Sequence, residues 1–158
     1  MLEGTAITLL QDGRAMRAEY KIGCDRGWRT RRVSVESAVG SEKNSMTLTV
    51  DPAGVWHTPT ESLSGLRECV DIDLAITPAT NTLPIRRLDL AIGQSRDVNA
   101  AWLKFPDLTL EVLPQCYTRI DSHRYRYQSG SGFSAELQVD DFGLITSYPD
   151  GWQQLASF

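Results

Sequence analysis

The chain has 158 residues, of which 41% are hydrophobic and 23% charged, with a formal net charge of −4 at pH 7. This composition is typical of a folded globular protein and excludes disordered, collagen-like and coiled-coil chains. The acidic balance argues against a nucleic-acid partner, because binding phosphates requires clustered Lys and Arg. We expect a single domain, residues 1–158, of a size that one core can support.

The N-terminus carries no export signal that the sequence reveals. Residues 1–6 lack the basic segment and apolar stretch of a signal peptide, and no apolar run approaches the roughly 20 residues of a membrane-spanning helix. We therefore predict a cytoplasmic protein without a transmembrane segment. The three cysteines, Cys24, Cys69 and Cys116, are too widely spaced for a disulfide framework or a zinc site, which indicates buried free thiols.

The first half of the chain has the pattern of strands with one buried face. Residues 14–24 alternate between apolar and polar side chains, which is the period of a half-buried strand. Residues 28–39 are extended again, and Arg29 and Arg31 share a face with the valines that follow. Residues 46–57 contain an Asp-Pro-Ala-Gly turn between two apolar runs and predict a hairpin.

The middle of the chain combines one clear strand with an ambiguous segment. Residues 70–76 predict a strand on which Asp71 and Asp73 point away from the apolar face. Residues 81–90 could form a short helix capped by Asn81, or a strand. We expect a bent strand with a helical turn before it.

The second half reads as short strands divided by Pro and Gly turns. The expected extended runs are 101–105, 108–113, 115–120, 124–128, 133–139 and 144–148. Residues 152–158 look helical, and no 10–15-residue helical pattern of a parallel crossover is seen. The predicted class is all-β, either one long, strongly curled antiparallel sheet or an open barrel-like meander, with one or two short helical turns. Curling is expected because so many strands in a flat sheet would expose long edges.

Asp71 and Asp73 are the strongest catalytic candidates. Two residues apart on one strand, their carboxylates would lie about 7 Å apart, which resembles a glycosidase pair. Neighbours on a strand point the same way, however, and cannot flank a scissile bond. A solvated face, or a salt bridge to Arg86 or Arg87, accounts for them better.

Other motifs offer no chemistry. His57 and His123 lie in separate segments without a nucleophile or metal motif around them. The Asp-Phe-Gly string at 141–143 and the Ser-Gly-Ser-Gly string at 129–132 fit turns rather than nucleotide sites. We predict no catalytic residue, no metal and no cofactor.

Tyrosines and arginines, together with Asp71 and Asp73, are the candidate ligand-binding residues. Tyr117, Tyr125 and Tyr127 fall in adjacent predicted strands, and tyrosine joins an apolar ring to a polar tip that suits a lipid or a sugar-bearing ligand. Ordinary cross-strand packing would place them in the same way. Four arginines could meet an anionic head group at a cavity mouth or simply lie on the surface: Arg29, Arg31, Arg86 and Arg87.

The sequence resembles the "putative glycolipid-binding" family of bacterial proteins at residues 20–31, 69–73 and 77–88. The most specific part is the string Thr-Asn-Thr-Leu-Pro-Ile-Arg-Arg-Leu at 80–88. The resemblance extends from about residue 13 almost to the end. It implies a curled or barrel-like sheet similar to that of bacterial lipoprotein carriers, with an apolar groove for a lipid or glycolipid. It also implies an abbreviated N-terminal stretch here, so that the groove need not be closed along that edge. It assigns no role to the matching residues, which are Arg31, Asp71, Asp73, Arg86, Arg87 and Tyr117.

We therefore expect a non-enzymatic binding protein that holds a lipid or glycolipid in the groove of a curled sheet. Two alternatives remain: a hydrolase of a sugar or lipid substrate that uses Asp71 or Asp73, and a protein-interaction scaffold with a filled core. A mostly apolar cavity of roughly 300 Å³ or more would favour the binding protein over the scaffold.

Overall fold

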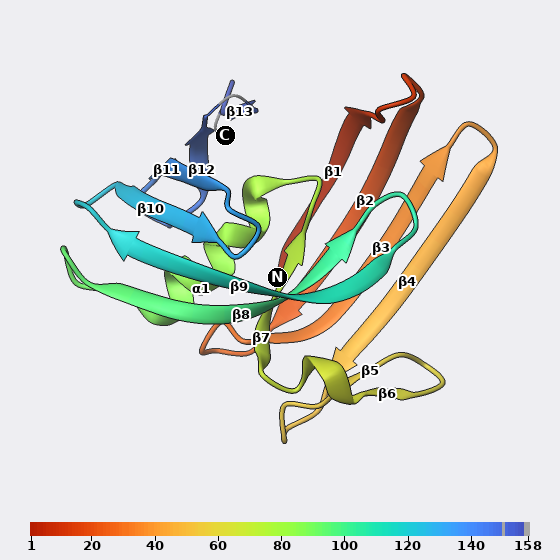
Figure 1. Ribbon diagram of the computed structural model, residues 1–158, viewed down its shortest axis with the longest axis horizontal. Coiled ribbons are helices and arrows are strands. Elements are labelled where there is room, and N and C mark those ends of the chain that lie inside the picture. Colours follow the sequence, from red (N-terminus) through yellow and green to blue (C-terminus); the bar gives the residue numbers. More distant parts are fainter. Residues whose placement is uncertain (150, 157–158) are drawn as a thin grey trace.

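The computed structural model describes residues 1–149 and 151–156. Over that part of the chain the strands form two sheets, one of six strands and one of seven. In Figure 1 the two sheets face each other across the centre of the molecule and spread apart toward the top of the view.

The first sheet is an antiparallel meander in which the strands lie side by side in chain order. Its strands are β1 (Leu2–Leu9), β2 (Ala15–Cys24), β3 (Thr30–Val39), β4 (Glu42–Val50), β5 (Trp56–His57) and β6 (Ser62–Leu63). Along β2 the side chains alternate strictly between exposed and buried, as the sequence period predicts. Strand β1 was not predicted from the sequence.

The second sheet runs in the order β13-β12-β11-β10-β9-β8-β7 and is curled. Its strands are β7 (Cys69–Leu74), β8 (Ser95–Lys104), β9 (Thr109–Arg119), β10 (Arg124–Ser129), β11 (Ser134–Val139), β12 (Ile145–Tyr148) and β13 (Trp152–Gln153). Strands β8 and β9 are long and curved, and the turn between them packs against the first sheet (Figure 1). β7 pairs with β8 in parallel, and the other neighbours are antiparallel.

The parallel pair is joined by short helices. A 3₁₀ turn, η1 (Ser64–Leu66), precedes β7, and η2 (Pro78–Asn81) runs directly into the helix α1 (Thr82–Leu88). The Thr77 side chain accepts a hydrogen bond from the Ala79 backbone N–H at 3.3 Å and so begins this helical segment. Asp89 then ends it in a left-handed conformation.

The core has two parts. The first lies between the sheets around Trp56, Leu48 and Ile72, which are all but inaccessible to solvent. The Trp56 indole N–H donates to the Cys69 carbonyl at 2.9 Å, so its one polar atom is satisfied. The second part lies inside the curled sheet, where Tyr125 and Leu137 pack with residues of α1.

The all-β class, the curled meander and the short helical turns are confirmed. The strands nevertheless divide between two hydrogen-bonded sheets rather than following one another in a single sheet. The expected bent strand at 81–90 is wrong, because Pro84 lies in the first turn of α1, where its missing N–H costs nothing. The exclusion of a parallel crossover also fails, because this crossover needs only η2 and a seven-residue helix.

Smaller differences concern the C-terminal part and the cysteines. The expected break at Pro114 is absent, since β9 runs through it. Of the predicted helix at 152–158, the structure shows strand β13 at its start, and residues 157–158 lie outside the described residues. The cysteines are free thiols, but only Cys69 is buried, while Cys24 and Cys116 are partly exposed.

Candidate functional site

Strand β7 separates an apolar layer from a polar one. Ile72 and Leu74 point into the core between the sheets, while Asp71 and Asp73 point the other way, as the sequence predicts. Of the two alternatives expected for these aspartates, a solvated face does not apply to Asp71, because the Asp71 side chain is buried. Asp71 is only 1% exposed.

Asp71 is held by an arginine. The Arg87 guanidinium donates to both of its carboxylate oxygens, from Nε at 3.1 Å and from NH2 at 2.5 Å. This bears out the ion pair with Arg87 expected from the sequence. Burial raises the pKa of Asp71, and the Arg87 guanidinium acts against that rise. Asp71 therefore has a complete set of partners and no accessible surface for a ligand.

Asp73 has a neutral partner instead. The Gln115 side-chain amide donates to Asp73 Oδ2 at 2.5 Å and to the Tyr127 hydroxyl at 3.1 Å. Burial raises the pKa of Asp73 to about 6, although the hydrogen bond from Gln115 opposes the rise. The salt bridges of the described residues include none to Asp73. It is thus a carboxyl group with an unusually high pKa and no cation beside it.

The network behind Asp73 is buried and rigid. The Tyr117 hydroxyl donates to Asn81 Oδ1 at 2.6 Å and to Gln115 Oε1 at 3.3 Å. Asn81 in turn donates to the Pro78 carbonyl at 3.0 Å. The side-chain amides of Asn81 and Gln115 each make hydrogen bonds through both the oxygen and the nitrogen, so neither amide can rotate freely. The orientation of the Gln115 N–H group that donates to Asp73 is therefore fixed.

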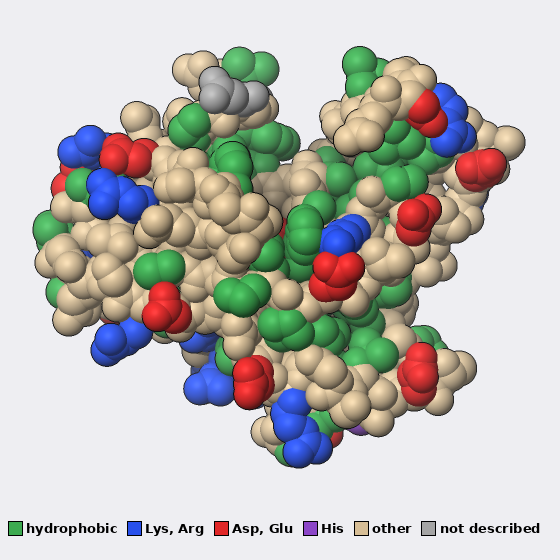
Figure 2. All heavy atoms as spheres, viewed as in Figure 1, with side chains coloured by type: hydrophobic (Ala, Val, Ile, Leu, Met, Phe, Trp, Pro, Cys, Tyr) green, Lys and Arg blue, Asp and Glu red, His purple; other side chains and the backbone are tan. Residues whose placement is uncertain are grey.

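A cavity of about 480 Å³ opens onto Asp73, and Thr8 of β1 is the one residue of the first sheet among the described residues that line it. Figure 2 shows a hollow at the top of the molecule, between the parts that Figure 1 labels β13 and β1. The side chains that line its depth and its mouth are Asp73, Leu74, Ile76, Asn81, Trp102, Leu113, Tyr127, Phe133, Tyr148 and Trp152, with Thr8 from β1. Its volume exceeds the roughly 300 Å³ of a typical ligand pocket.

The cavity is polar at its buried end and aromatic at its mouth. Tyr127 and Asn81 are 4% and 7% exposed, whereas Phe133 and Trp152 are 44% and 47% exposed. The Tyr127 and Phe133 ring centroids lie 6.1 Å apart, and Phe133 stacks on Tyr148 at 5.8 Å with an interplanar angle of 4°. These rings form one continuous wall from the buried end to the mouth.

Charge is nearly absent from the cavity. Asp73 is the one charged side chain that lines it within residues 1–149 and 151–156, and no Lys, Arg or His joins it there. The tyrosine hydroxyls stay protonated, since burial raises the pKa of Tyr148 to about 12 and that of Tyr127 further. The cavity therefore offers one carboxyl acceptor and neutral hydroxyl donors.

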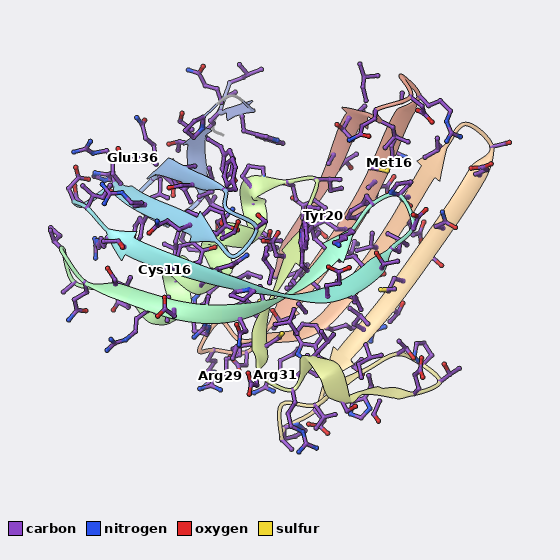
Figure 3. The ribbon with its side chains drawn as sticks, in the orientation of Figure 1. Met16, Tyr20, Arg29, Arg31, Cys116 and Glu136 are labelled. Carbon is purple, nitrogen blue, oxygen red and sulfur yellow. The ribbon has the colours of Figure 1, made fainter. Side chains whose placement is uncertain are left out.

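The arginines predicted to bind a ligand lie elsewhere. Arg31 donates to Asp25 Oδ2 and to the Asp51 carbonyl, and Arg29 is exposed. Figure 3 places Arg29 and Arg31 at the lower end of the view, below β7, whereas the hollow opens at the top. These two arginines are therefore not brought together with the cavity.

Arg86 is also engaged away from the cavity. Its guanidinium lies 5.3 Å from the Trp28 ring centroid and 4.7 Å from that of Phe142. These rings belong to the β2–β3 and β11–β12 turns, so Arg86 links the two sheets by cation–π contacts. With Arg87 on Asp71, no predicted arginine lines the cavity.

The three predicted tyrosines do not all lie at the same site. Tyr117 and Tyr127 are directly paired across β9 and β10, with ring centroids 5.2 Å apart, and Tyr127 lines the cavity. Tyr125 lies in a separate depression, beside Arg119. Sequence reasoning missed Gln115, although it alternates with Leu113 and Tyr117 on the buried face of β9, which could have marked it as an inward polar residue.

A larger depression, of about 710 Å³, follows the edge of the polar layer. Its lining includes the charged residues Glu68, Arg87 and Asp97, together with Cys116, which Figure 3 shows on β9. It lacks an aromatic wall, since no Phe, Tyr or Trp of the described residues lines it. The cavity at Asp73 is the better match to an amphipathic ligand.

Two further searches of the described residues give negative results. None of their helices is long and apolar enough to cross a membrane. Nor do three or more of their His, Cys, Asp or Glu side chains gather where they could hold a metal ion.

Comparison with known proteins gives one matching family and one similar crystal structure. The model of the family described as "Putative glycolipid-binding" matches residues 2–154. The crystal structure of a DUF1089 family protein from Pseudomonas aeruginosa is similar to this chain, with a TM-score of 0.88 and 31% sequence identity, over 98% of this chain and 93% of that one. No curated protein matches the chain.

Proposed function

Since this chain belongs to the "Putative glycolipid-binding" family, we propose that it binds a lipid or glycolipid in the cavity that opens onto Asp73. The observation that carries the proposal is the combination of an aromatic wall with a fixed polar cluster in one cavity. Such a surface matches a molecule that has both an apolar and a polar part.

A hydrolytic use of the aspartate pair has less support. Asp71 is enclosed and paired with Arg87, so it cannot reach a substrate. That leaves Asp73 as the one carboxyl of the pair at the cavity, and glycoside hydrolysis usually needs two. Binding without turnover is therefore the function that the geometry supports best.

The first test is to look for the ligand. The purified protein is extracted with organic solvent, and the extract is analysed by mass spectrometry. We expect an amphiphile that co-purifies in proportion to the protein.

A pair of variants on β1 ties such a ligand to the cavity. Thr8 faces the cavity, while its neighbour Ile7 is 74% exposed on the opposite face of the strand. Thr8→Trp should fill the mouth and remove the co-purifying amphiphile, and Ile7→Trp should leave it in place. Equal retention in both variants, or no amphiphile in the wild type and no uptake of one from a lipid extract, contradicts the proposal.

A further inference from the structure

The depth profile of the cavity determines which end of an amphiphile can enter. In a carrier that encloses acyl chains, the enclosed end of the cavity must be apolar, because burying a polar group without a partner costs free energy. Here the enclosed end carries the polar groups of Asp73, Asn81 and Tyr127 beside the buried Leu74 and Leu113, and the large apolar rings Phe133 and Trp152 lie at the exposed mouth. An acyl tail pushed to the bottom would strip water from Asp73 without supplying a hydrogen bond in its place.

The charge of the cavity limits the head group. A phosphate or sulfate would meet the Asp73 carboxyl without any Lys, Arg or His on the lining that the described residues provide. The two predicted arginines of α1 already have partners: Arg87 contacts Asp71, and Arg86 contacts Trp28 and Phe142. An anionic head group is therefore disfavoured.

The aromatic geometry separates a sugar from an ammonium group. A quaternary ammonium is bound by several ring faces turned toward one point. Phe133 and Tyr148 instead stack on each other, so their faces do not turn toward one point, and the apolar face of a sugar ring can stack on an outer face of the pair. The Tyr148 hydroxyl is also a donor that an ammonium group cannot use.

The hydrogen-bonding groups complement hydroxyls in particular. Gln115 already donates to the Tyr127 oxygen, so the Tyr127 proton remains available for an acceptor. Asp73 accepts from Gln115 at one oxygen and keeps further acceptor capacity. A sugar hydroxyl, which donates and accepts at once, can satisfy both sides.

Building on the proposed function, we propose that the amphiphile enters head first: an uncharged, hydroxyl-rich sugar lies against Asp73, Tyr127 and Tyr148, and the tail leaves past Phe133 and Trp152. Asp73 is the specificity-determining group of this site. The orientation is opposite to that of a protein that encloses acyl chains.

The test compares amphiphiles that share a tail. Octyl glucoside, octyl phosphate and octyltrimethylammonium, each below its micellar concentration, are titrated into the full chain at pH 7.5. Binding is followed by calorimetry and by the fluorescence of Trp102 and Trp152, which line the cavity. We expect octyl glucoside to bind at least about tenfold more tightly than the other two, the difference that one charge-assisted hydrogen bond supports.

Competition then tests the orientation. Methyl glucoside should displace octyl glucoside, and octanol should not, because only the head group reaches the buried end. Displacement by octanol alone would overturn head-first entry. Tightest binding of the phosphate or the ammonium compound would overturn the sugar while leaving amphiphile binding intact, whereas failure of all three and of a total lipid extract would remove the proposed function itself.

Asp73→Asn supplies the residue-level test, with Asp107→Asn, an exposed carboxyl outside the cavity, as its matched control. The variant should bind octyl glucoside about tenfold more weakly, and the control should bind it like the wild type. In the wild type the affinity should fall as the pH drops through about 6, where Asp73 takes up a proton, and in Asp73→Asn this pH dependence should be absent. Wild-type affinity that is independent of pH, with full binding by Asp73→Asn, would exclude Asp73 as the determinant.

Discussion

The two sides of β7 have different surroundings. On one side, around Trp56, Leu48 and Ile72, buried apolar side chains of both sheets pack together, and we call this region the closed end. On the other side a cavity of about 480 Å³ opens onto Asp73, and we call this region the open end. The closed end thus provides stability, and the open end provides a recognition surface.

The difference lies in what each polar group has for a partner. At the closed end the Trp56 N–H is paired with a carbonyl, and on the neighbouring face of β7 Asp71 is paired with Arg87. At the open end Asp73 has only the neutral Gln115. A buried carboxylate with so little stabilisation of its charged form is typical of a binding site, because a ligand can supply the hydrogen bonds that the protein does not.

The largest expected effect comes from the closed end. Trp56→Ala removes a fully buried side chain and leaves the Cys69 carbonyl without its donor, so the free energy of unfolding should fall by about 4 kcal/mol. Trp152→Ala, at the mouth of the cavity, should lower it by less than about 1 kcal/mol. Urea denaturation of both variants measures the difference, and similar losses would show that the two ends are not distinct in stability.

The next effect concerns the ion pair beneath α1. Arg87→Leu leaves the Asp71 carboxyl buried without a cation and should cost about 3 kcal/mol at pH 8. The loss should shrink as the pH falls, because the pKa of Asp71, already raised by burial, rises further and protonation removes the charge. Arg126→Leu, which breaks an exposed pair with Glu136, is the control and should cost less than about 1 kcal/mol. A loss for Arg87→Leu that is equally large at pH 5 and pH 8 would contradict this account.

The smallest effect is a gain. The pKa of Asp73 is raised from 3.8 to about 6 in the folded chain, so its contribution to stability is complete below pH 4 and is lost as the pH rises through 6. Asp73→Asn cannot ionise and should therefore be more stable than the wild type by roughly 2 to 3 kcal/mol at pH 8, with little difference at pH 4. Thermal unfolding at the two pH values checks this, with Asp107→Asn as the control. A variant less stable than the wild type at pH 8 would mean that the Asp73 carboxylate supports the fold.

The strands with one wet face could be predicted from the sequence, because their side chains alternate with a period of two. Residues 14–24 show this, and β2 has the expected register of buried and exposed side chains. The crossover after β7 could not be predicted in the same way. Its helix has seven residues, too few for a helical period, and Pro84 suits the first turn of a helix as well as an irregular strand.

The candidate site was predictable only in part. Asp73 and Tyr127 were among the predicted residues, and both line the cavity. Phe133 comes from the turn between β10 and β11, Tyr148 from β12 and Thr8 from β1, and no local sequence pattern predicts that these residues lie close together. The arginines were predicted because they are charged, but Arg31, Arg86 and Arg87 already have partners in the fold, which only the three-dimensional arrangement reveals.

The strand order has a consequence for how the chain acquires its cavity. Within the described residues β1 to β6 pair only with their neighbours in sequence, as do β8 to β13, and no ladder joins the two sheets. Each meander can therefore assemble from hairpins of low contact order, which form quickly. Among the described residues that line the cavity, Thr8 is the one from the first meander, so docking of the two meanders completes the wall of the cavity at β1. We thus expect a bound ligand to stabilise the docked state of the two sheets. It should slow their separation and leave the stability of the individual hairpins unchanged.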